Sequence, residues 1–173
     1  AELREGLSNV ISFNSLSKRS SAPGLRSGFL VGDEEIIKRY GQFVTFGGSP
    51  LPLPILHAST ALWNDDEHVV ENRSYYAENF GIAEEILKPY DDLLVPQAGF
   101  FLWLKVNDDK KAAKILWQKF SLRVMPGSFM SKNANGINPG RGYLRISLVD
   151  KKEVIEETMK RICLFLKMDV AQE

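Results

Sequence analysis

A short segment, residues 15–28, concentrates side chains that could bind an anion and react with a carbonyl group. Ser15 and Ser17 supply hydroxyl donors and Arg26 supplies a planar guanidinium fork, which together suit a phosphate dianion. Lys18 can act as an amine nucleophile toward an aldehyde when its lone pair is free. A solvated turn would have a similar composition, so these residues by themselves predict an anion site with a neighbouring amine and specify no reaction.

Two short apolar strands are expected to frame this segment. Residues 10–13 are apolar and β-rich, and residues 29–31 form a second apolar run. A polar loop is predicted between them, from Asn14 to Gly24. Continuous apolar runs between turn signals are typical of strands that are buried on both faces. Because ligands of open α/β sheets bind at strand ends, this loop is the expected place for the anion site.

The rest of the chain changes character about halfway along. Asp33 is expected to cap a helix that runs to about Phe43. Two further helices are predicted at residues 55–63 and 67–87. In the second half, strands are predicted at residues 93–95, 100–106, 122–126 and 143–149, and helices at residues 110–120 and 151–167. An α/β portion is thus followed by an α+β portion, with a boundary expected near residues 75–90.

Composition excludes several classes of partner. The 22 basic side chains balance 22 acidic ones, so the overall field attracts neither nucleic acid nor an anionic membrane. Cys163 is the only cysteine, so no internal disulfide can form, and no spacing typical of metal ligands is found. The sequence contains no apolar run of about 18 residues, so no membrane span is expected. A reducing, cytoplasmic compartment fits these features best.

The segment from Ser15 to Gly28 resembles the cofactor-lysine segment of class I/II aminotransferases, whose pattern is S-x-S-K-x(5)-G-x-R-x-G. The resemblance continues in the same order through residues 96–103, 125–129 and 139–147. It implies a fold-type-I enzyme that uses pyridoxal 5'-phosphate. It also implies that the substrates are small amino acids and 2-oxo acids, and no metal is implied.

The same resemblance assigns roles to individual side chains. Lys18 would hold the cofactor as a Schiff base and later move the proton between the substrate Cα and the cofactor. Ser15, Ser17 and Arg26 match positions that bind the cofactor phosphate, with Ser17 the weakest of the three matches. Arg145 matches the arginine that binds the substrate α-carboxylate, where a bidentate fork sets which Cα–H bond lies perpendicular to the cofactor ring.

In domain terms, the resemblance implies that residues 1–75 are the C-terminal remainder of the large, cofactor-binding domain. Residues 76–173 would then be the small α+β domain. Family members also carry an aspartate facing the pyridine nitrogen, a tyrosine and an asparagine on the ring oxygen, and a stacked aromatic, all well before the cofactor lysine. Only 17 residues precede Lys18, so we expect a C-terminal fragment that does not transaminate alone. The full-length protein is expected to be a homodimer.

Further details resemble proteobacterial N-succinyldiaminopimelate aminotransferases, namely residues 18–29, 61–65 and 136–142. The implied reaction moves an amino group between N-succinyl-LL-2,6-diaminopimelate and 2-oxoglutarate in lysine biosynthesis. Because these substrates carry several carboxylates, a second substrate-binding cation is expected. Arg141 and, more weakly, Arg19 are the candidates, and both would suit solvated loop positions equally well.

Three alternatives stay open at this point. A class I aminotransferase of other specificity, for aspartate-type or aromatic substrates, would keep all of these core residues. A fold-type-I C–S β-lyase shares the lysine and the arginines but uses the cofactor for a different reaction. A non-catalytic, aminotransferase-like effector domain of a transcription regulator would need a basic DNA-binding segment upstream, and none is visible in these residues.

Overall fold

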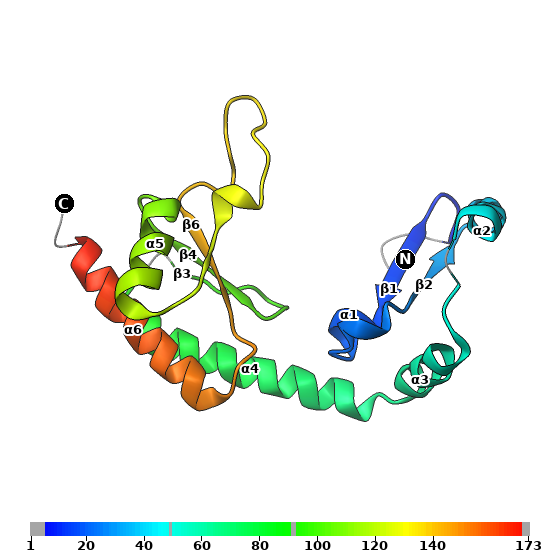
Figure 1. Ribbon diagram of the computed structural model, residues 1–173, viewed down its shortest axis with the longest axis horizontal. Helices are drawn as coiled ribbons and strands as arrows, with labels where there is room; N and C mark the ends of the chain where they lie inside the picture. Colours follow the sequence, from blue (N-terminus) through cyan, green and yellow to red (C-terminus); the bar gives the residue numbers. More distant parts are fainter. Residues whose placement is uncertain (1–5, 49, 91–92, 171–173) are drawn as a thin grey trace. The chain divides into compact units, whose positions relative to one another are not determined.

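The computed structural model describes residues 6–48, 50–90 and 93–170, and the chain divides into two compact units (Figure 1). The first unit comprises residues 1–72 and the second comprises residues 73–173. Among the described residues, the first unit contains a two-stranded sheet and the second a four-stranded sheet.

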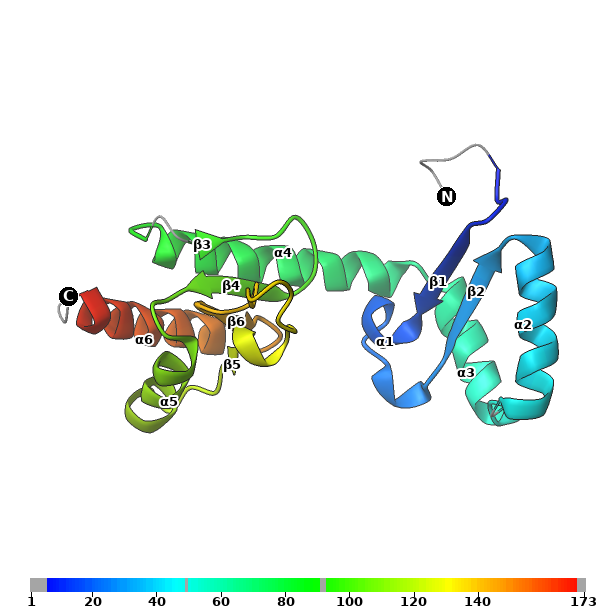
Figure 2. The same ribbon diagram turned by 90° about the horizontal axis from the view of Figure 1, so that it is seen from above.

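An antiparallel hairpin forms the sheet of the first unit (Figure 2). Its strands are β1, Ile11–Ser15, and β2, Gly28–Gly32, so both predicted strands are confirmed. The connection between them holds a one-turn helix, α1, Leu16–Arg19, and a 3-10 turn, η1, Pro23–Leu25. The prediction of a loop throughout residues 14–24 is therefore wrong.

Leu16 explains why a helix forms there. Its side chain is fully buried. Its amide donates to the Ser27 carbonyl at 3.2 Å, and its own carbonyl accepts hydrogen bonds from the amides of Ser20 and Ala22 at 3.1 and 3.2 Å. One apolar residue in a serine-rich run gives no periodic signal, so the helix is invisible to a pattern-based prediction.

The hairpin is more exposed than its apolar sequence predicts. Phe13 is 75% exposed and Val31 is 49% exposed, so the expectation of strands buried on both faces is wrong for this chain. The strands are exposed because too few layers of secondary structure pack against the hairpin. In the described part of the first unit, two strands and a few helices cannot cover both faces of a sheet.

Helices α2, Glu34–Gly47, and α3, Leu53–Asn64, follow the hairpin. Asp33 caps α2 as predicted, because its carboxylate accepts a hydrogen bond from the Ile36 amide at 3.2 Å. The same carboxylate accepts one from the Asn9 amide at 2.8 Å. The hydrogen bonds from Asn9 and Ile36 hold the pKa of Asp33 below its ordinary value. Both helices exist where expected, and α2 extends beyond its predicted end.

The second unit has the predicted α+β arrangement. Its four antiparallel strands lie in the order β3-β4-β6-β5. These strands are β3, Leu93–Leu94, β4, Phe101–Lys105, β5, Met125–Pro126, and β6, Tyr143–Ser147. The remaining elements are helices α4, Glu67–Leu87, α5, Asp109–Phe120, and α6, Lys152–Val170, and the 3-10 turn η2, Gly127–Phe129. Helix α4 covers the residues predicted for it and starts in the first unit, whereas β5 is shorter than predicted.

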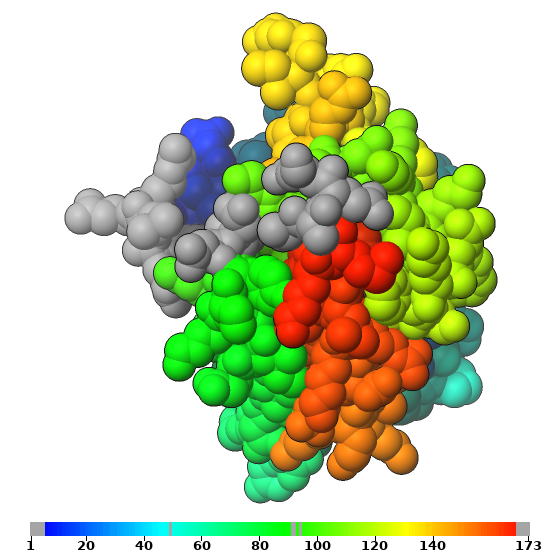
Figure 3. Space-filling view, turned by 90° about the vertical axis from the view of Figure 1, so that its left-hand side faces the viewer, coloured from blue at the N-terminus to red at the C-terminus, as the bar shows by residue number. Residues whose placement is uncertain are grey.

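Alternation along β4 and β6 separates a buried face of the sheet from an open face. The buried face is made by Leu102, Leu104, Leu144 and Ile146. Helices α4, α5 and α6 cover it and contribute Leu87, Leu116 and Phe165, among others, to the core. Figure 3 shows α6, in orange and red, between the green part of α4 and the lime-green α5. The half-exposed residues of the open face are Phe101, Trp103, Tyr143 and Arg145.

Helix α4 is tied to the segment between β6 and α6 by side-chain hydrogen bonds. Asn79 is fully buried, and its amide group donates to the Leu148 carbonyl at 2.8 Å and to the Asp150 carbonyl at 3.1 Å. The Tyr75 hydroxyl donates to the Asp150 carbonyl at 2.6 Å. These donors satisfy carbonyl groups that have left the strand ladder.

Replacing Asn79 with alanine is expected to lower the free energy of unfolding by about 1–3 kcal/mol, because the Leu148 carbonyl would stay buried without a donor. Chemical unfolding followed by circular dichroism measures the loss. Glu85→Ala, at an exposed position of the same helix, is the matched control and should change stability little. A loss in Asn79→Ala no larger than that of the control would show that these hydrogen bonds do not stabilise the unit.

Candidate active site

Ser15 marks the point where β1 ends and α1 begins. Its side-chain oxygen accepts a hydrogen bond from the Ser17 amide at 3.1 Å, which is the N-cap geometry of a helix. The Ser17 hydroxyl lies 3.0 Å from the same oxygen, and the Ser27 carbonyl oxygen lies 3.3 Å from it. Two hydroxyl groups therefore lie side by side at the end of the strand, and Lys18 follows them directly in α1.

Arg26 ends the turn that leads into β2. Its backbone is left-handed, with φ of 52°, and its guanidinium donates to the Pro23 carbonyl at 2.8 Å. Two residues later, Gly28 pairs with Ser15, so Arg26 returns to the end of the hairpin where the two hydroxyls lie. A Cβ at Gly28 would lie 2.5 Å from the Asn14 carbonyl oxygen, so only glycine lets the strands approach this closely.

The structure thus brings four of the predicted residues, Ser15, Ser17, Lys18 and Arg26, to one end of the hairpin. Ser17 is half-buried and the other three are exposed. Hydroxyl and guanidinium donors are the groups that bind a phosphate dianion, and a lysine amine beside them can react with an aldehyde. This donor set fits the phosphate and the aldehyde of pyridoxal phosphate.

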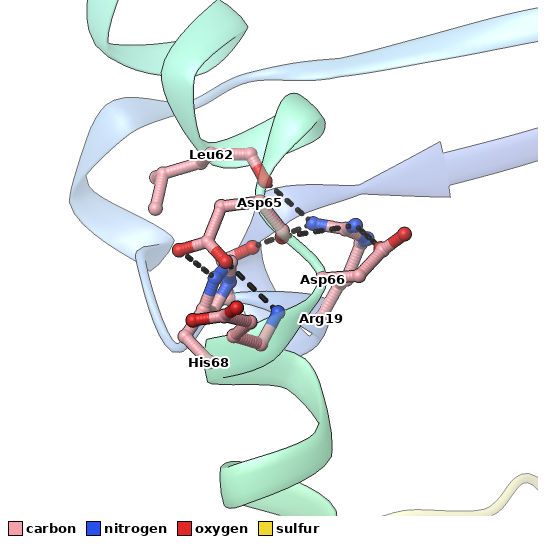
Figure 4. Close-up of polar contacts among 7 residues, drawn as sticks. Arg19, Leu62, Asp65, Asp66 and His68 are labelled. Atoms are coloured by element: carbon pink, nitrogen blue, oxygen red, sulfur yellow. Dashed lines mark hydrogen bonds and ion pairs between the residues drawn. The ribbon is translucent and has the colours of Figure 1, made fainter.

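Arg19 is bound to protein groups of the first unit (Figure 4). Its guanidinium donates to the Leu62 carbonyl at 2.7 Å and forms an ion pair with the Asp66 carboxylate. The guanidinium carbon lies 5.0 Å from the centroid of the Trp63 ring. Because these partners occupy its donors and one face, the structure does not support the expectation that Arg19 is a substrate-binding cation. The sequence does not indicate these partners, because all of them are distant from Arg19 along the chain.

Arg145 lies in the middle of β6 in the second unit, opposite Trp103 of β4 and Met125 of β5. Its guanidinium carbon is 4.2 Å from the centroid of the Phe101 ring. No carboxylate of a described residue lies within ion-pair distance of it. A guanidinium held over an aromatic ring and not paired with a described carboxylate is suited to bind a ligand carboxylate.

Arg141 lies in the turn before β6, where its amide donates to the Asn138 carbonyl at 3.1 Å. Its side chain is exposed and lines a polar cleft of about 650 Å³ together with residues that include Lys110 and Ser128. Arg145 does not line this cleft. The structure therefore does not bring the two predicted substrate arginines together in this cleft.

Asp109 also lines that cleft and was not singled out from the sequence. It is the first residue of α5 and only 3% exposed, and its carboxylate accepts hydrogen bonds from the amides of Ser128 and Gly142 at 2.9 and 3.5 Å. Burial raises the pKa of Asp109, but the hydrogen bonds from Ser128 and Gly142 outweigh it, so the pKa lies below its ordinary value. An acidic residue at a helix start usually faces solvent, so no sequence signal marks this one.

Comparison with known proteins places these features in one family. The family model for aminotransferase class I and II matches residues 1–162. An LL-diaminopimelate aminotransferase of Natranaerobius thermophilus is 32% identical over 159 residues, which are 89% of this chain and 40% of that protein. The crystal structure of an aminotransferase from Neisseria meningitidis is 40% identical, with a TM-score of 0.88, over 95% of this chain and 42% of that one.

A third similar protein is known from a solved structure. The structure described as "probable N-succinyldiaminopimelate aminotransferase" from Thermus thermophilus is 29% identical, with a TM-score of 0.76. It covers 90% of this chain, and the match spans 42% of that chain.

The chain therefore belongs to the class I and II aminotransferase family and has its fold-type-I architecture, which confirms the resemblance drawn from the motifs. Members of this family use pyridoxal phosphate. The chain spans about two fifths of the length of the relatives it matches. Within residues 6–48, 50–90 and 93–170, no helix is long and apolar enough to cross a membrane, and no cluster of three or more His, Cys, Asp or Glu could hold a metal ion.

Replacing Asp109 with asparagine is expected to lower the free energy of unfolding at neutral pH by about 1.5–3 kcal/mol, because two amides lose a charged acceptor. The folded-state pKa of Asp109 lies below its ordinary value. Its stabilisation is therefore complete above the unfolded-state pKa and is lost as the pH falls through the folded-state pKa.

The stability difference between the unsubstituted protein and Asp109→Asn should accordingly shrink as the pH is lowered from about 5 toward about 2. Chemical unfolding at several pH values measures it, with the exposed Glu153→Gln as the matched control. A difference that stays constant over this range would mean that the Asp109 charge does not stabilise the fold.

Proposed function

We propose that the full-length protein carrying this chain is a pyridoxal-phosphate-dependent aminotransferase in which Lys18 is the cofactor lysine. The observation that carries the proposal is the convergence of Ser15, Ser17, Lys18 and Arg26 at one end of the β1–β2 hairpin. This convergence occurs in a chain that belongs to the class I and II aminotransferase family.

When bound, pyridoxal phosphate supplies an electron sink that stabilises negative charge at the substrate Cα. Arg26, with Ser15 and Ser17, would hold the phosphate through charge-assisted hydrogen bonds. Lys18 would hold the cofactor through its aldehyde, with loss of water, and as a free amine it would take the substrate Cα proton and return it.

In this proposal, Arg145 binds the substrate α-carboxylate. The Phe101 ring, 4.2 Å from the guanidinium carbon, supports one face of the guanidinium and leaves its edge for the carboxylate. A bidentate pair of hydrogen bonds then restricts rotation of the substrate and selects which Cα–H bond breaks.

The proposal also covers the organisation of the protein. Residues 1–75 are the C-terminal remainder of the large domain, residues 76–173 are the small domain, and the working protein is a cytoplasmic homodimer. The division of the chain into two compact units after residue 72 supports the domain part of this proposal.

For the substrates, we propose N-succinyl-LL-2,6-diaminopimelate as the amino donor and 2-oxoglutarate as the acceptor, in lysine biosynthesis. Two relatives are described as aminotransferases of diaminopimelate or of its N-succinyl form, which supports a diaminopimelate substrate. The exposed Arg141, which lines the polar cleft together with Lys110, Asp108 and Asp109, offers a cation for an additional carboxylate. Because the two relatives differ in whether their named substrate is succinylated, the test has to include both forms.

The test follows glutamate formation by the full-length protein with cofactor, 2-oxoglutarate and a series of amino donors. We expect N-succinyldiaminopimelate to be used with higher kcat/KM than unmodified diaminopimelate, aspartate or aromatic amino acids. Lys18→Ala should reduce turnover by about a thousandfold or more, because both the attachment point and the base are lost. Lys38→Ala, at an exposed position of α2, is the matched control and should retain activity.

The outcomes separate the remaining alternatives. Lys18-dependent glutamate formation from another amino donor would support the aminotransferase activity and would contradict the proposal of a succinylated substrate. Release of sulfide or a thiol from a cysteine conjugate, without glutamate formation, would favour a C–S β-lyase. Absence of both turnover and cofactor binding would favour a non-catalytic effector domain.

Replacing Arg141 with alanine tests the second cation. We expect KM for N-succinyldiaminopimelate to rise about tenfold with little change in kcat, since a contact made equally in the ground and transition states is lost. Steady-state kinetics measure both constants, and Arg123→Ala, another exposed arginine of the second unit, is the control. An unchanged KM in Arg141→Ala would remove this residue from the proposed site.

A further inference from the structure

The helix that carries Lys18 is too short to hold its own orientation. Helix α1 has four residues. A helix of this length is not stable in water on its own, because the free-energy cost of nucleating it exceeds the stabilisation that a single turn provides. The direction in which Lys18 projects must therefore be set by the contacts that α1 makes with the rest of the first unit.

Two residues of α1, three positions apart, anchor it. Leu16 is fully buried, and the side chain of Arg19 is only 17% exposed. Residues at positions i and i+3 lie on the same side of a helix. The anchored side of α1 therefore faces away from the side that carries Ser17 and Lys18, and the side chain of Lys18 is exposed.

Arg19 contacts the end of α3 and the link between α3 and α4 (Figure 4). One guanidinium nitrogen donates to the Leu62 carbonyl at 2.7 Å. The other donates to the Asp65 carbonyl at 3.4 Å and to the Asp66 carboxylate at 2.5 Å. Leu62 lies in the last turn of α3, where carbonyls lack an intrahelical donor, so Arg19 both anchors α1 and completes α3.

The link that Arg19 contacts has a polar side-chain contact of its own. The Asp65 carboxylate lies 2.9 Å from the His68 Nδ1 atom, at the start of α4. This hydrogen bond to His68 holds the pKa of Asp65 below its ordinary value. The Asp65 carbonyl, which accepts a hydrogen bond from Arg19, therefore belongs to a turn that has side-chain contacts of its own.

An aromatic pair completes the set of contacts. The Arg19 guanidinium carbon lies 5.0 Å from the centroid of the Trp63 ring, and Trp63 packs edge-on against Phe29 of β2 at 4.8 Å. Strand β2 pairs with β1, whose last residue immediately precedes α1. The contacts thus form a closed ring from α1 through α3 and β2 back to the start of α1.

We propose that Arg19 is a positioning residue that fixes the direction in which Lys18 projects from α1. This proposal rests on the proposed role of Lys18 as the cofactor lysine. Arg19 binds neither cofactor nor substrate, because its guanidinium donates to Ser20, Leu62, Asp65 and Asp66. It holds α1 in one orientation, so that the Lys18 amine is already placed for reaction.

The planar shape of the guanidinium matters more than its charge. The Asp66 carboxylate is 88% exposed, and an ion pair with so exposed a partner contributes little to stability. A guanidinium can donate to the Leu62 carbonyl from one nitrogen while its carbon lies over the Trp63 ring and its other nitrogen binds Asp65 and Asp66. A lysine has one nitrogen and cannot make these contacts at once.

Hydrogen–deuterium exchange of the full-length protein without cofactor measures the order of α1 directly. Arg19→Ala is expected to speed exchange in the peptide covering residues 16–22 by about tenfold or more. Arg19→Lys should have nearly the same effect, whereas Asp66→Asn should have almost none. Arg39→Ala, which removes an exposed arginine of α2, is the matched control.

The rate at which added pyridoxal phosphate is captured, followed by the absorbance of the bound cofactor, measures the consequence for Lys18. Arg19→Ala and Arg19→Lys are expected to slow capture on the order of tenfold. Asp66→Asn and Arg39→Ala should leave it unchanged. Each variant is measured at a temperature at which circular dichroism shows it folded.

Three results would overturn the proposal: unchanged exchange and capture in Arg19→Ala, full rescue of both by Arg19→Lys, or faster exchange without slower capture. If Arg19→Ala does not fold, Arg19→Lys and Asp66→Asn are compared instead. Faster exchange and slower cofactor capture in Arg19→Lys than in Asp66→Asn would support the proposal, and equal rates in the two variants would overturn it. If the unsubstituted protein captures no cofactor at Lys18, the proposed function fails, whereas the exchange data still show whether Arg19 orders α1.

Discussion

The change of backbone direction at Ser15 is the constraint on which the arrangement of the first unit depends. The Ser15 hydroxyl lies at the end of the strand and caps the helix. Its oxygen accepts a hydrogen bond from the Ser17 amide and lies within hydrogen-bonding distance of the Ser27 carbonyl oxygen. Helix α1 can then bury Leu16 on one side and expose Lys18 on the other. The chemistry proposed for the lysine follows from this division, because the exposed side is the one with the neighbouring hydroxyls.

The second unit fixes its arginine by close backbone packing. Gly127 and Gly140 face each other so closely that a Cβ on either would collide with the backbone of the other. The buried carboxylate of Asp109 accepts hydrogen bonds from the amides of Ser128 and Gly142, which belong to the two segments that contain these glycines. The start of β6 is therefore set by contacts on both sides, and the alternation of the strand places Arg145 on the open face of the sheet.

Elements with a long periodic pattern could be predicted from the sequence, and α4 matches its prediction at both ends. The motif around Lys18 also identified residues that converge in space, because serine, lysine and arginine at fixed spacing on one hairpin connection are close by chain geometry alone. The buried role of Asp109 and the contacts of Arg19 could not be predicted, because their partners are distant in sequence. The strand burial was overestimated, since an apolar run records which residues suit a core and not whether a second layer covers them.

In the proposed enzyme, Lys18 is the residue that carries the cofactor. Borohydride reduction of the full-length protein loaded with pyridoxal phosphate, followed by peptide mapping, identifies the modified lysine. We expect one reduced adduct on the peptide that contains Lys18, and its disappearance in Lys18→Ala. An adduct at another lysine in the folded protein, or bound cofactor with no adduct at Lys18, would contradict it.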